Sequence, residues 1–364
     1  MTACGARVGE RRSIPVRHAA SWARPRWPLI AAVGLAVAAL GLVAWVLARS
    51  RDQAVAWTER PEVLQAIDDV LDQFLEETGI TGARVAIAPT TGPHLSLVRG
   101  DRPDEPVQLY SLTKPFVAVV ARRLAERDEV DLDAPIGPLP SLADPDAFAD
   151  VSIADLLEHR VGMTDYRALI EPDEVVPMPE LLDRVVADFP PERSEGQFYS
   201  TSGYLAVGVV LEQATGTSWD RLVAQEVLEP LGLADTFVGD PEASGSRHAA
   251  GAMFSTMDDL SRFGVALFRD RSLVSRSSLE RMIPRDGEIF GAGLWALCPC
   301  AADGTGHVAA GHPGETAVLY WFRDSGTIIA LDLDETMWVP SGQPGQVDAL
   351  AGRLDRLVTA GVRP

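Results

Sequence analysis

The sequence has 364 residues and 46% hydrophobic side chains, enough for one large domain or two ordinary ones with a proper core. Residues 1–51 hold eight arginines and one acid, whereas the remainder holds 24 basic and 51 acidic side chains. Because so acidic a body repels phosphate backbones, the charge balance argues against nucleic-acid binding.

The first predicted element is an uncharged stretch of 22 residues from Trp27 to Ala48. As a helix it would measure about 33 Å, which is enough to cross a bilayer core. Six arginines precede it and two follow it closely, which predicts a cytoplasmic basic tail at 1–26 and an extracytoplasmic body after a linker at 49–60. We therefore predict a single-pass membrane protein. A cleaved signal peptide, with a site near "AVA" at 54–56, is the alternative.

The body at 61–364 begins with apolar residues at helical spacing and ends with an amphipathic pattern. Helical patterns dominate between these ends, from 112 to about 285, and strand patterns lie on either side. In chain order the other predicted elements are a helix at 61–78, strands at 83–89 and 95–99, strand patterns at 308–322 and 327–335, and a helix at 345–361. The predicted fold class is therefore α/β: an antiparallel sheet built from both chain ends, with flanking helices and an inserted, mainly helical lobe. A cleft is expected where lobe and sheet join.

The segment "YSLTKPF" at 110–116 contains the only lysine of the chain, since the other 31 basic side chains are arginines. Arginine stays protonated in proteins, whereas the protonation of a lysine responds to its surroundings. If a helix begins at Ser111, positions i and i+3 share one face, and the Lys114 amine lies beside the Ser111 hydroxyl. Pro115 is compatible only with a helix start. The segment predicts a serine nucleophile activated by an amine, with an N-capping serine as the alternative.

Several further segments follow "YSLTK" in a fixed order. They are "LLEHRVGMTDY" (156–166), "FYSTSGYLAVGVVLEQATG" (198–216), "GAMFSTMDDLSRFG" (251–264), "FGAGLW" (290–295) and "GHPGETAVLY" (311–320). Together these motifs resemble the serine β-lactamase and penicillin-binding superfamily. Within it they resemble the branch of class C β-lactamase-like proteins, D-alanyl-D-alanine carboxypeptidases and esterases. The resemblance covers residues 61 to about 360.

The resemblance implies roles for three residues. Ser111 matches the acylated nucleophile, Lys114 the lysine of the same motif, and Tyr199 the tyrosine of the second motif, Tyr-x-Asn. That tyrosine is the expected general base toward the serine, because a nearby ammonium favours the phenolate form. Without the resemblance, Tyr199 would be interpreted as a core aromatic residue beside a helix start.

The third motif is represented by "HPG" on the strand that should line the cleft. Gly314 would let a substrate backbone approach closely, and His312 would donate a hydrogen bond. The backbone N–H groups of Ser111 and Glu315 would form the oxyanion hole. Read alone, His312 is a strand-edge histidine without a role.

Two positions depart from the family pattern. Thr201 replaces the asparagine of the second motif, and Pro313 replaces a residue whose hydroxyl would hold a substrate carboxylate. Losing a contact to the substrate carbonyl costs on the order of 10²–10³ in rate. Both changes weaken the case for efficient turnover of β-lactams or D-alanyl-D-alanine, and they leave acyl transfer itself intact.

The two cysteines of the body, Cys298 and Cys300, lie close in sequence to His307 and His312. Tetrahedral zinc accepts two sulfurs and two imidazoles, but the spacing differs from that of known zinc sites, and His312 has another role by the resemblance. A Cys298–Cys300 disulfide would close a small, strained ring, and two free thiols remain open. The prediction is an enzyme without a metal or organic cofactor.

The sequence therefore predicts a membrane-anchored serine hydrolase that forms an acyl-enzyme on an ester, amide or β-lactam. Its expected partners are a small-molecule or peptidoglycan-derived substrate and the membrane, with no nucleic acid. The alternative is a non-catalytic, penicillin-binding-like receptor or sensor of cell-wall fragments. Neither the natural substrate nor the oligomeric state follows from the residues.

Overall fold

The computed structural model describes residues 60–100, 103, 105–171, 174–240, 245–297, 309–313, 315–334 and 344–360. The predicted tail at 1–26, the predicted membrane helix at 27–48 and the linker up to residue 59 lie outside these residues. Among the residues that the structure describes, no helix is long and apolar enough to span a bilayer.

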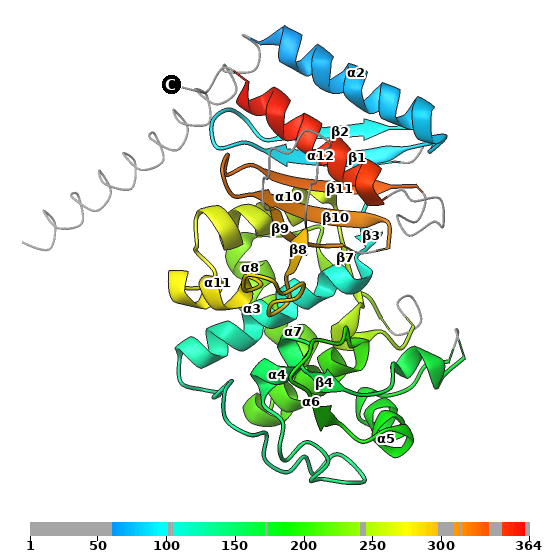
Figure 1. Cartoon of the computed structure of the whole chain (residues 1–364), viewed down its shortest axis with the longest axis vertical. Coiled ribbons are helices and arrows are strands. Elements are labelled where there is room, and N and C mark those ends of the chain that lie inside the picture. Colours follow the sequence, from blue (N-terminus) through cyan, green and yellow to red (C-terminus); the bar gives the residue numbers. More distant parts are fainter. Residues whose placement is uncertain are drawn as a thin grey trace, which may run out of the picture. The chain divides into compact units, whose positions relative to one another are not determined.

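A six-stranded antiparallel sheet with the strand order β2-β1-β11-β10-β9-β8 forms one layer of the body (Figure 1). Its strands are β1 (Ala83–Ala88), β2 (Leu95–Arg99), β8 (Trp295–Leu297), β9 (Ala309–Pro313), β10 (Ala317–Phe322) and β11 (Ile328–Leu333). Strand β1 pairs with β11, so that Ala83 lies opposite Leu333. The sheet therefore joins both ends of the chain, which confirms the predicted architecture.

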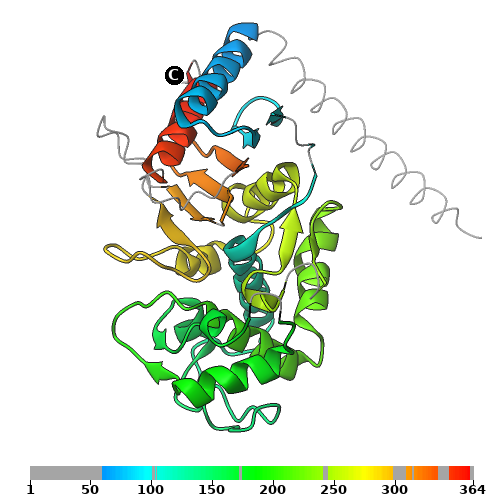
Figure 2. The same ribbon diagram turned by 90° about the vertical axis from the view of Figure 1, so that its right-hand side faces the viewer.

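Successive residues of the central strands face two different hydrophobic cores. Val85 and Ile87 pack with helices α2 (Pro61–Thr78) and α12 (Pro344–Thr359), which lie side by side on one face (Figures 1 and 2). Ala86 belongs to the larger core on the other face, where helix α10 (Met257–Gly264) contacts β1, β10 and β11. Burial on both faces explains why "ARVAIA" is continuously apolar apart from Arg84.

Gly264 lets α10 approach the sheet closely. A Cβ atom at this position would lie 2.7 Å from Cγ2 of Ile328, a distance that side chains do not tolerate. The helix therefore reaches the sheet at a residue without a side chain, which is a packing reason for glycine at this point.

The helical lobe is inserted between β2 and β8, as predicted. Its α-helices are α3 (Thr113–Glu126), α4 (Ile153–Leu157), α5 (Met178–Asp188), α6 (Thr201–Thr215), α7 (Trp219–Val223), α8 (Glu229–Leu231), α10 and α11 (Arg276–Met282). Its short strands are β3 (Val107–Gln108), β4 (Val161–Gly162), β5 (Glu192–Arg193), β6 (Phe237–Val238) and β7 (Met253–Ser255). Short 3-10 turns are η1 (Tyr110–Leu112), η2 (Tyr166–Ala168) and η4 (His248–Ala250), and π-helical turns are η3 (Ala224–Leu228) and η5 (Val265–Arg269).

Two local predictions differ from the structure. The strand pattern at 308–322 forms two paired strands, β9 and β10, in which His312 lies opposite Leu319. Ser111 lies in the 3-10 turn η1, and the α-helix begins two residues later. The predicted helix at 61–78 has the bounds observed for α2.

Candidate active site

The Ser111 hydroxyl is the point at which two other functional side chains meet. Lys114 Nζ donates a hydrogen bond to Ser111 Oγ over 3.0 Å, and the Tyr199 hydroxyl donates to the same oxygen over 2.7 Å. Lys114 is fully buried, whereas Ser111 and Tyr199 keep part of their surface exposed. The three residues predicted to carry the chemistry therefore lie together, and Ser111 is only partly buried.

The backbone just before Ser111 adopts a conformation that few side chains occupy. Tyr110 has a φ of 47°, and the Leu109 N–H donates to the Met253 carbonyl over 2.8 Å. Neither η1 nor α3 has a hydrogen bond from a capping side chain, so Ser111 is no N-cap. A left-handed residue next to a nucleophile is a feature that functional sites commonly retain.

The Lys114 ammonium is held in the apolar interior by a small set of partners. It donates to the Ala250 carbonyl over 2.9 Å, and it lies 5.2 Å and 5.5 Å from the ring centres of Tyr199 and Tyr204. Gly293, at a φ of 77°, brings the "FGAGLW" segment against α3, where an added Cβ would lie 3.1 Å from the Lys114 carbonyl oxygen. Aromatic faces and one carbonyl thus stabilise the buried charge.

Three aromatic rings surround Tyr199. His159, Trp295 and Phe290 lie 4.7, 5.3 and 5.6 Å from the Tyr199 ring centre. The backbone of Tyr199 leads directly into α6, where the side chain of the N-cap Ser200 accepts from the N–H of Gly203 over 3.0 Å. Both the ring and the backbone of Tyr199 are thereby fixed relative to Ser111.

The sequence analysis assigned no role to His159, although it quoted the motif that contains this residue. His159 Nδ1 accepts a hydrogen bond from the Ser200 N–H over 3.0 Å, which places the imidazole proton on Nε2. Burial, and then the charge of Lys114, lower the pKa of His159 to about 3. A neutral imidazole therefore packs against the ring of Tyr199 at neutral pH, so His159 adds no positive charge beside Lys114.

The His159→Asn variant should lose part of the acid sensitivity of the fold. The unfolded chain binds a proton on His159 below its ordinary pKa of about 6.5, which the folded protein excludes down to about pH 3. Stability is therefore lost as the pH falls, by about 2 kcal/mol between pH 7 and pH 5. Asparagine tolerates the φ of 58° found here and can still accept from Ser200.

The measurement for His159 is the free energy of urea unfolding at pH 7 and at pH 5, in both proteins. Burial also lowers the pKa values of His94 and His248, but their contributions are common to both proteins and cancel in the comparison. Equal pH dependence in the wild type and in His159→Asn would contradict the assignment.

The backbone of the third motif lies beside the turn that contains Ser111. Strand β9, which includes His312, contacts the turn η1, whereas Gly314 and the side chain of His312 lie outside the described part. Burial raises the pKa of Tyr110, and the negative charge of Glu315 adds to this effect, so Glu315 also lies near the nucleophile turn. The hydrogen-bonding roles predicted for His312, Gly314 and Glu315 remain predictions.

Thr201 is the first residue of α6 and is buried. Its Oγ1 has no hydrogen-bond partner among the described residues. This residue occupies the place of the asparagine expected from the second motif, and the structure leaves its role in substrate positioning as a prediction.

A second Ser-His-Asp arrangement lies outside this site and is not suited to catalysis. His94 Nε2 lies 2.6 Å from Ser261 Oγ, and His94 Nδ1 lies 3.6 Å from Asp258 Oδ1. Ser261 is fully buried, and its hydroxyl donates to the Asp258 carbonyl over 2.8 Å. A carbonyl carbon cannot reach this oxygen, so the cluster has a structural role.

The predicted zinc alternative falls largely outside the described residues. Cys298, Cys300 and His307 are not described, and neither is the side chain of His312. Within the described ranges, no group of three or more histidine, cysteine or acidic side chains could hold a metal ion. The described geometry at Ser111 involves a hydroxyl, an amine and a phenol only.

The fold and the convergence of a serine, a lysine and a tyrosine define the class: the site is that of a serine hydrolase with the β-lactamase architecture. Comparison with known proteins assigns the family. The Beta-lactamase family model matches residues 67–336, so the chain belongs to this family. The resemblance inferred from the motifs is thereby confirmed.

Individual relatives include esterases and penicillin-binding proteins. Esterase EstB of Burkholderia gladioli is 32% identical over 221 residues, which cover 52% of this chain and 55% of the relative. Penicillin-binding protein 4* of Bacillus subtilis is 27% identical over 155 residues, or 38% of this chain and 32% of the relative. The matches thus span about a third to just over half of the curated relatives.

Solved structures with the same fold include an amidase. D-amino acid amidase of Ochrobactrum anthropi SV3, complexed with L-phenylalanine, superposes with a TM-score of 0.69 at 22% identity. The alignment covers 83% of this chain and all of the amidase. An octameric penicillin-binding protein homologue of Pyrococcus abyssi gives a TM-score of 0.60 at 19% identity, over 82% of this chain and 77% of that one. These likenesses establish the fold.

Proposed function

We propose that this protein hydrolyses a small ester or amide through an acyl-enzyme on Ser111. The observation that carries the proposal is the pair of hydrogen bonds to Ser111 Oγ, from Lys114 at 3.0 Å and from Tyr199 at 2.7 Å. A serine hydroxyl is a weak nucleophile until an adjacent group accepts its proton. Here a phenol and an amine reach the same oxygen, and the residue that carries it is only partly buried.

In the proposed mechanism Tyr199 acts as a phenolate, which the Lys114 ammonium favours from 5.2 Å away. The phenolate accepts the Ser111 proton as Oγ bonds to the carbonyl carbon, and the negative charge moves to the carbonyl oxygen. The N–H groups of Ser111 and Glu315 stabilise this oxyanion. When the tetrahedral species collapses, the C–O or C–N bond breaks, and Tyr199 returns the proton to the leaving group.

Water completes the cycle in the reverse sense. Tyr199 takes a proton from the attacking water, a second oxyanion forms at the same N–H groups, and the acid product leaves Ser111 with its proton restored. The net reaction consumes one water and needs no cofactor.

For the substrate, we propose simple esters and amides ahead of β-lactams. Thr201 and Pro313 replace residues that would hold a substrate carbonyl and carboxylate in the family pattern. The names of the relatives, an esterase and a penicillin-binding protein, and of the structural neighbour, a D-amino acid amidase, span this range. A peptidoglycan-derived peptide is the natural substrate class that accords with an extracytoplasmic site.

For the location, we propose a single-pass protein of the cell membrane with its N-terminus in the cytoplasm. The support is the uncharged stretch at 27–48 with six arginines before it. The hydrolase body at 61–364 would then face the outside of the cell.

A receptor that binds cell-wall fragments without hydrolysing them is the second candidate. The observation in its favour is Thr201, whose hydroxyl has no partner among the described residues where the family pattern has an amide that positions substrate. Such a receptor would retain binding, and even acylation, without turnover.

The test uses the full-length chain in detergent with a fluorophosphonate, a fluorescent penicillin and a chromogenic short-chain ester. We expect an intact-mass adduct on Ser111 and ester turnover, both lost in Ser111→Ala. An adduct without turnover would favour the receptor. A folded protein that forms no adduct with either reagent would overturn the hydrolase assignment.

A further inference from the structure

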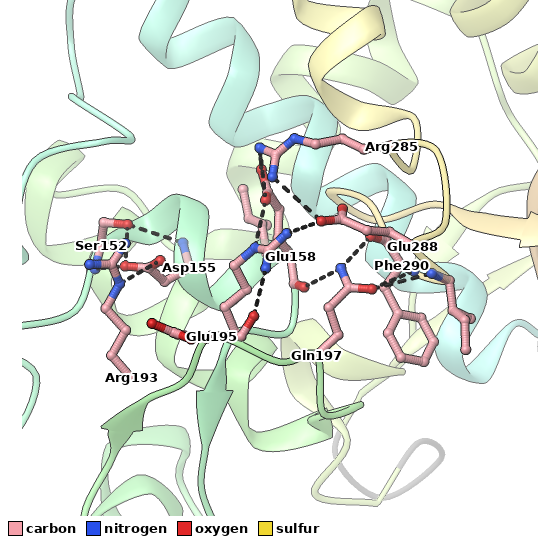
Figure 3. Close-up of polar contacts among 12 residues, drawn as sticks. Ser152, Asp155, Glu158, Arg193, Glu195, Gln197, Arg285, Glu288 and Phe290 are labelled. Atoms are coloured by element: carbon pink, nitrogen blue, oxygen red, sulfur yellow. Dashed lines mark hydrogen bonds and ion pairs between the residues drawn. The ribbon is translucent and has the colours of Figure 1, made fainter.

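The side-chain amide of Gln197 is fully hydrogen-bonded to backbone groups of two other segments (Figure 3). Its Nε2 donates to the carbonyl of Glu158 over 3.2 Å and to that of Phe290 over 2.6 Å. Its Oε1 accepts from the N–H groups of Ile289 and Phe290, each over 3.2 Å. Carbonyls only accept and N–H groups only donate, so a flipped amide would lose all four bonds.

The two segments that Gln197 joins carry the rings that pack against Tyr199. Phe290 is held at both its N–H and its carbonyl, and its ring lies 5.6 Å from Tyr199 and 5.0 Å from Trp295. Glu158 precedes His159, whose ring lies 4.7 Å from Tyr199. Gln197 itself precedes Tyr199 by two residues, so one amide fixes the base's own segment and both flanking rings.

Ion pairs around this amide also link the same segments. Glu158 pairs with Arg160 at 3.1 Å and with Arg285 at 3.3 Å, and Arg160 also pairs with Glu288 (Figure 3). The Arg285 side chain is 66% exposed, so its pair contributes little. Gln197 differs from Arg285 in that its amide is uncharged and makes four hydrogen bonds of fixed direction.

We propose that Gln197 is a positioning residue for the general base Tyr199. It touches neither Ser111 nor the substrate, and it acts by holding the ring of Tyr199 where the 2.7 Å contact with Ser111 forms. A displacement of about 1 Å at such a contact lowers the rate about 10²-fold. The inference rests on the proposed function, because it assigns Gln197 to that base.

The first test is kinetic and uses the full-length protein with a chromogenic ester. Gln197→Ala should lower kcat about 100-fold and leave KM within about threefold, because the base moves and the binding surface stays. Gln197→Glu keeps the two acceptor contacts but sets a carboxylate oxygen against the carbonyl oxygens of Glu158 and Phe290, so we expect a loss at least as large as in Gln197→Ala. Gln213→Ala, which removes an exposed amide bonded to the Pro138 carbonyl, is the matched control and should leave kcat unchanged.

The second test separates positioning from general stability. The quantity measured is the rate of fluorophosphonate labelling, in Tyr199→Phe and in the double variant Tyr199→Phe with Gln197→Ala. Adding Gln197→Ala should slow labelling less than about twofold further, because the phenol that Gln197 positions is already absent. Losses that multiply in the double variant would overturn the inference, as would a change confined to KM. Unchanged kcat in Gln197→Ala would overturn it directly.

A crystal structure of Gln197→Ala decides the matter independently of activity. We expect the distance from the Tyr199 hydroxyl to Ser111 Oγ to lengthen beyond about 3.5 Å, outside hydrogen-bond range. If the contact is retained, the inference is wrong whether or not the enzyme turns over. If Gln197→Ala does not fold, the structure and kcat of Gln197→Glu are read by the same two criteria. A wild-type protein that neither labels nor hydrolyses would count against the proposed function alone.

Discussion

Replacing Lys114 by arginine should abolish hydrolysis as completely as replacing it by alanine. We expect kcat/KM for a chromogenic ester to fall by about 10³-fold or more in both variants, because the base Tyr199 depends on the Lys114 ammonium and a general base typically contributes 10²–10⁴. Arginine preserves the positive charge, but its planar head group cannot take the place of the compact ammonium. Its larger head must also enter a fully buried position 3.0 Å from Ser111 Oγ and 2.9 Å from the Ala250 carbonyl.

The two Lys114 variants together separate the presence of a positive charge from its exact position. If a positive charge near Tyr199 is enough whatever the shape of its head group, Lys114→Arg should retain at least a tenth of wild-type activity, and that result would contradict the prediction. Arg127→Ala, at the end of the same helix, is the control. It removes a half-exposed ion pair with Glu226 and should leave kcat/KM unchanged. Circular dichroism establishes that each variant is folded.

The Ser111–Lys114 pair could be predicted because its geometry is local. Residues three apart near a helix start share a face, whether the first turn is 3-10 or α. The contact was therefore predicted correctly although Ser111 lies in a 3-10 turn and not in the α-helix. Tyr199 lies 88 residues further along the chain, and only the motif resemblance connected it to Ser111. The arrangement of the sheet was likewise predictable from strand patterns at both chain ends.

The supports of the site could not be predicted, because they depend on contacts between distant backbone segments. Gln197 bonds to carbonyls 39 and 93 residues away, and no side-chain pattern encodes a backbone partner. His159 lies within one of the motifs of the sequence analysis. Its neutral state, however, results from burial and from the charge of Lys114, which both lower its pKa. Burial and through-space charge become visible only when the fold is known.

A buried ion pair also links strands β1 and β11, which come from opposite ends of the chain. No sequence pattern predicted this pair. Arg84 on β1 lies opposite Asp332 on β11, and Arg84 Nε donates to Asp332 Oδ2 over 2.8 Å. Thr316 donates to the other carboxylate oxygen over 2.6 Å. Arg84 is 2% exposed and Asp332 is fully buried, so neither charge is compensated by water.

Asp332→Asn should therefore be among the most destabilising single changes in the sheet. Removing one partner of a buried pair leaves the other charge buried, which typically costs about 3–5 kcal/mol of the free energy of unfolding. Asp334 lies 3.5 Å from the Arg84 guanidinium and remains as a weaker counter-charge, so we expect the lower end of that range. Urea unfolding of the full-length protein in detergent measures the change.

The control for this prediction is a more exposed ion pair between the same sheet and helix α2. Asp72, 66% exposed, pairs with Arg99 of β2 at 2.9 Å, and Asp72→Asn should cost less than about 1 kcal/mol. In the double variant Arg84→Met with Asp332→Leu neither charge of the pair remains, so much of the lost stability should return. If Asp332→Asn lowers the free energy of unfolding no more than Asp72→Asn does, the buried pair does not stabilise the pairing of β1 with β11. If the double variant is worse than Asp332→Asn, the hydrogen bonds of the pair matter more than its buried charge.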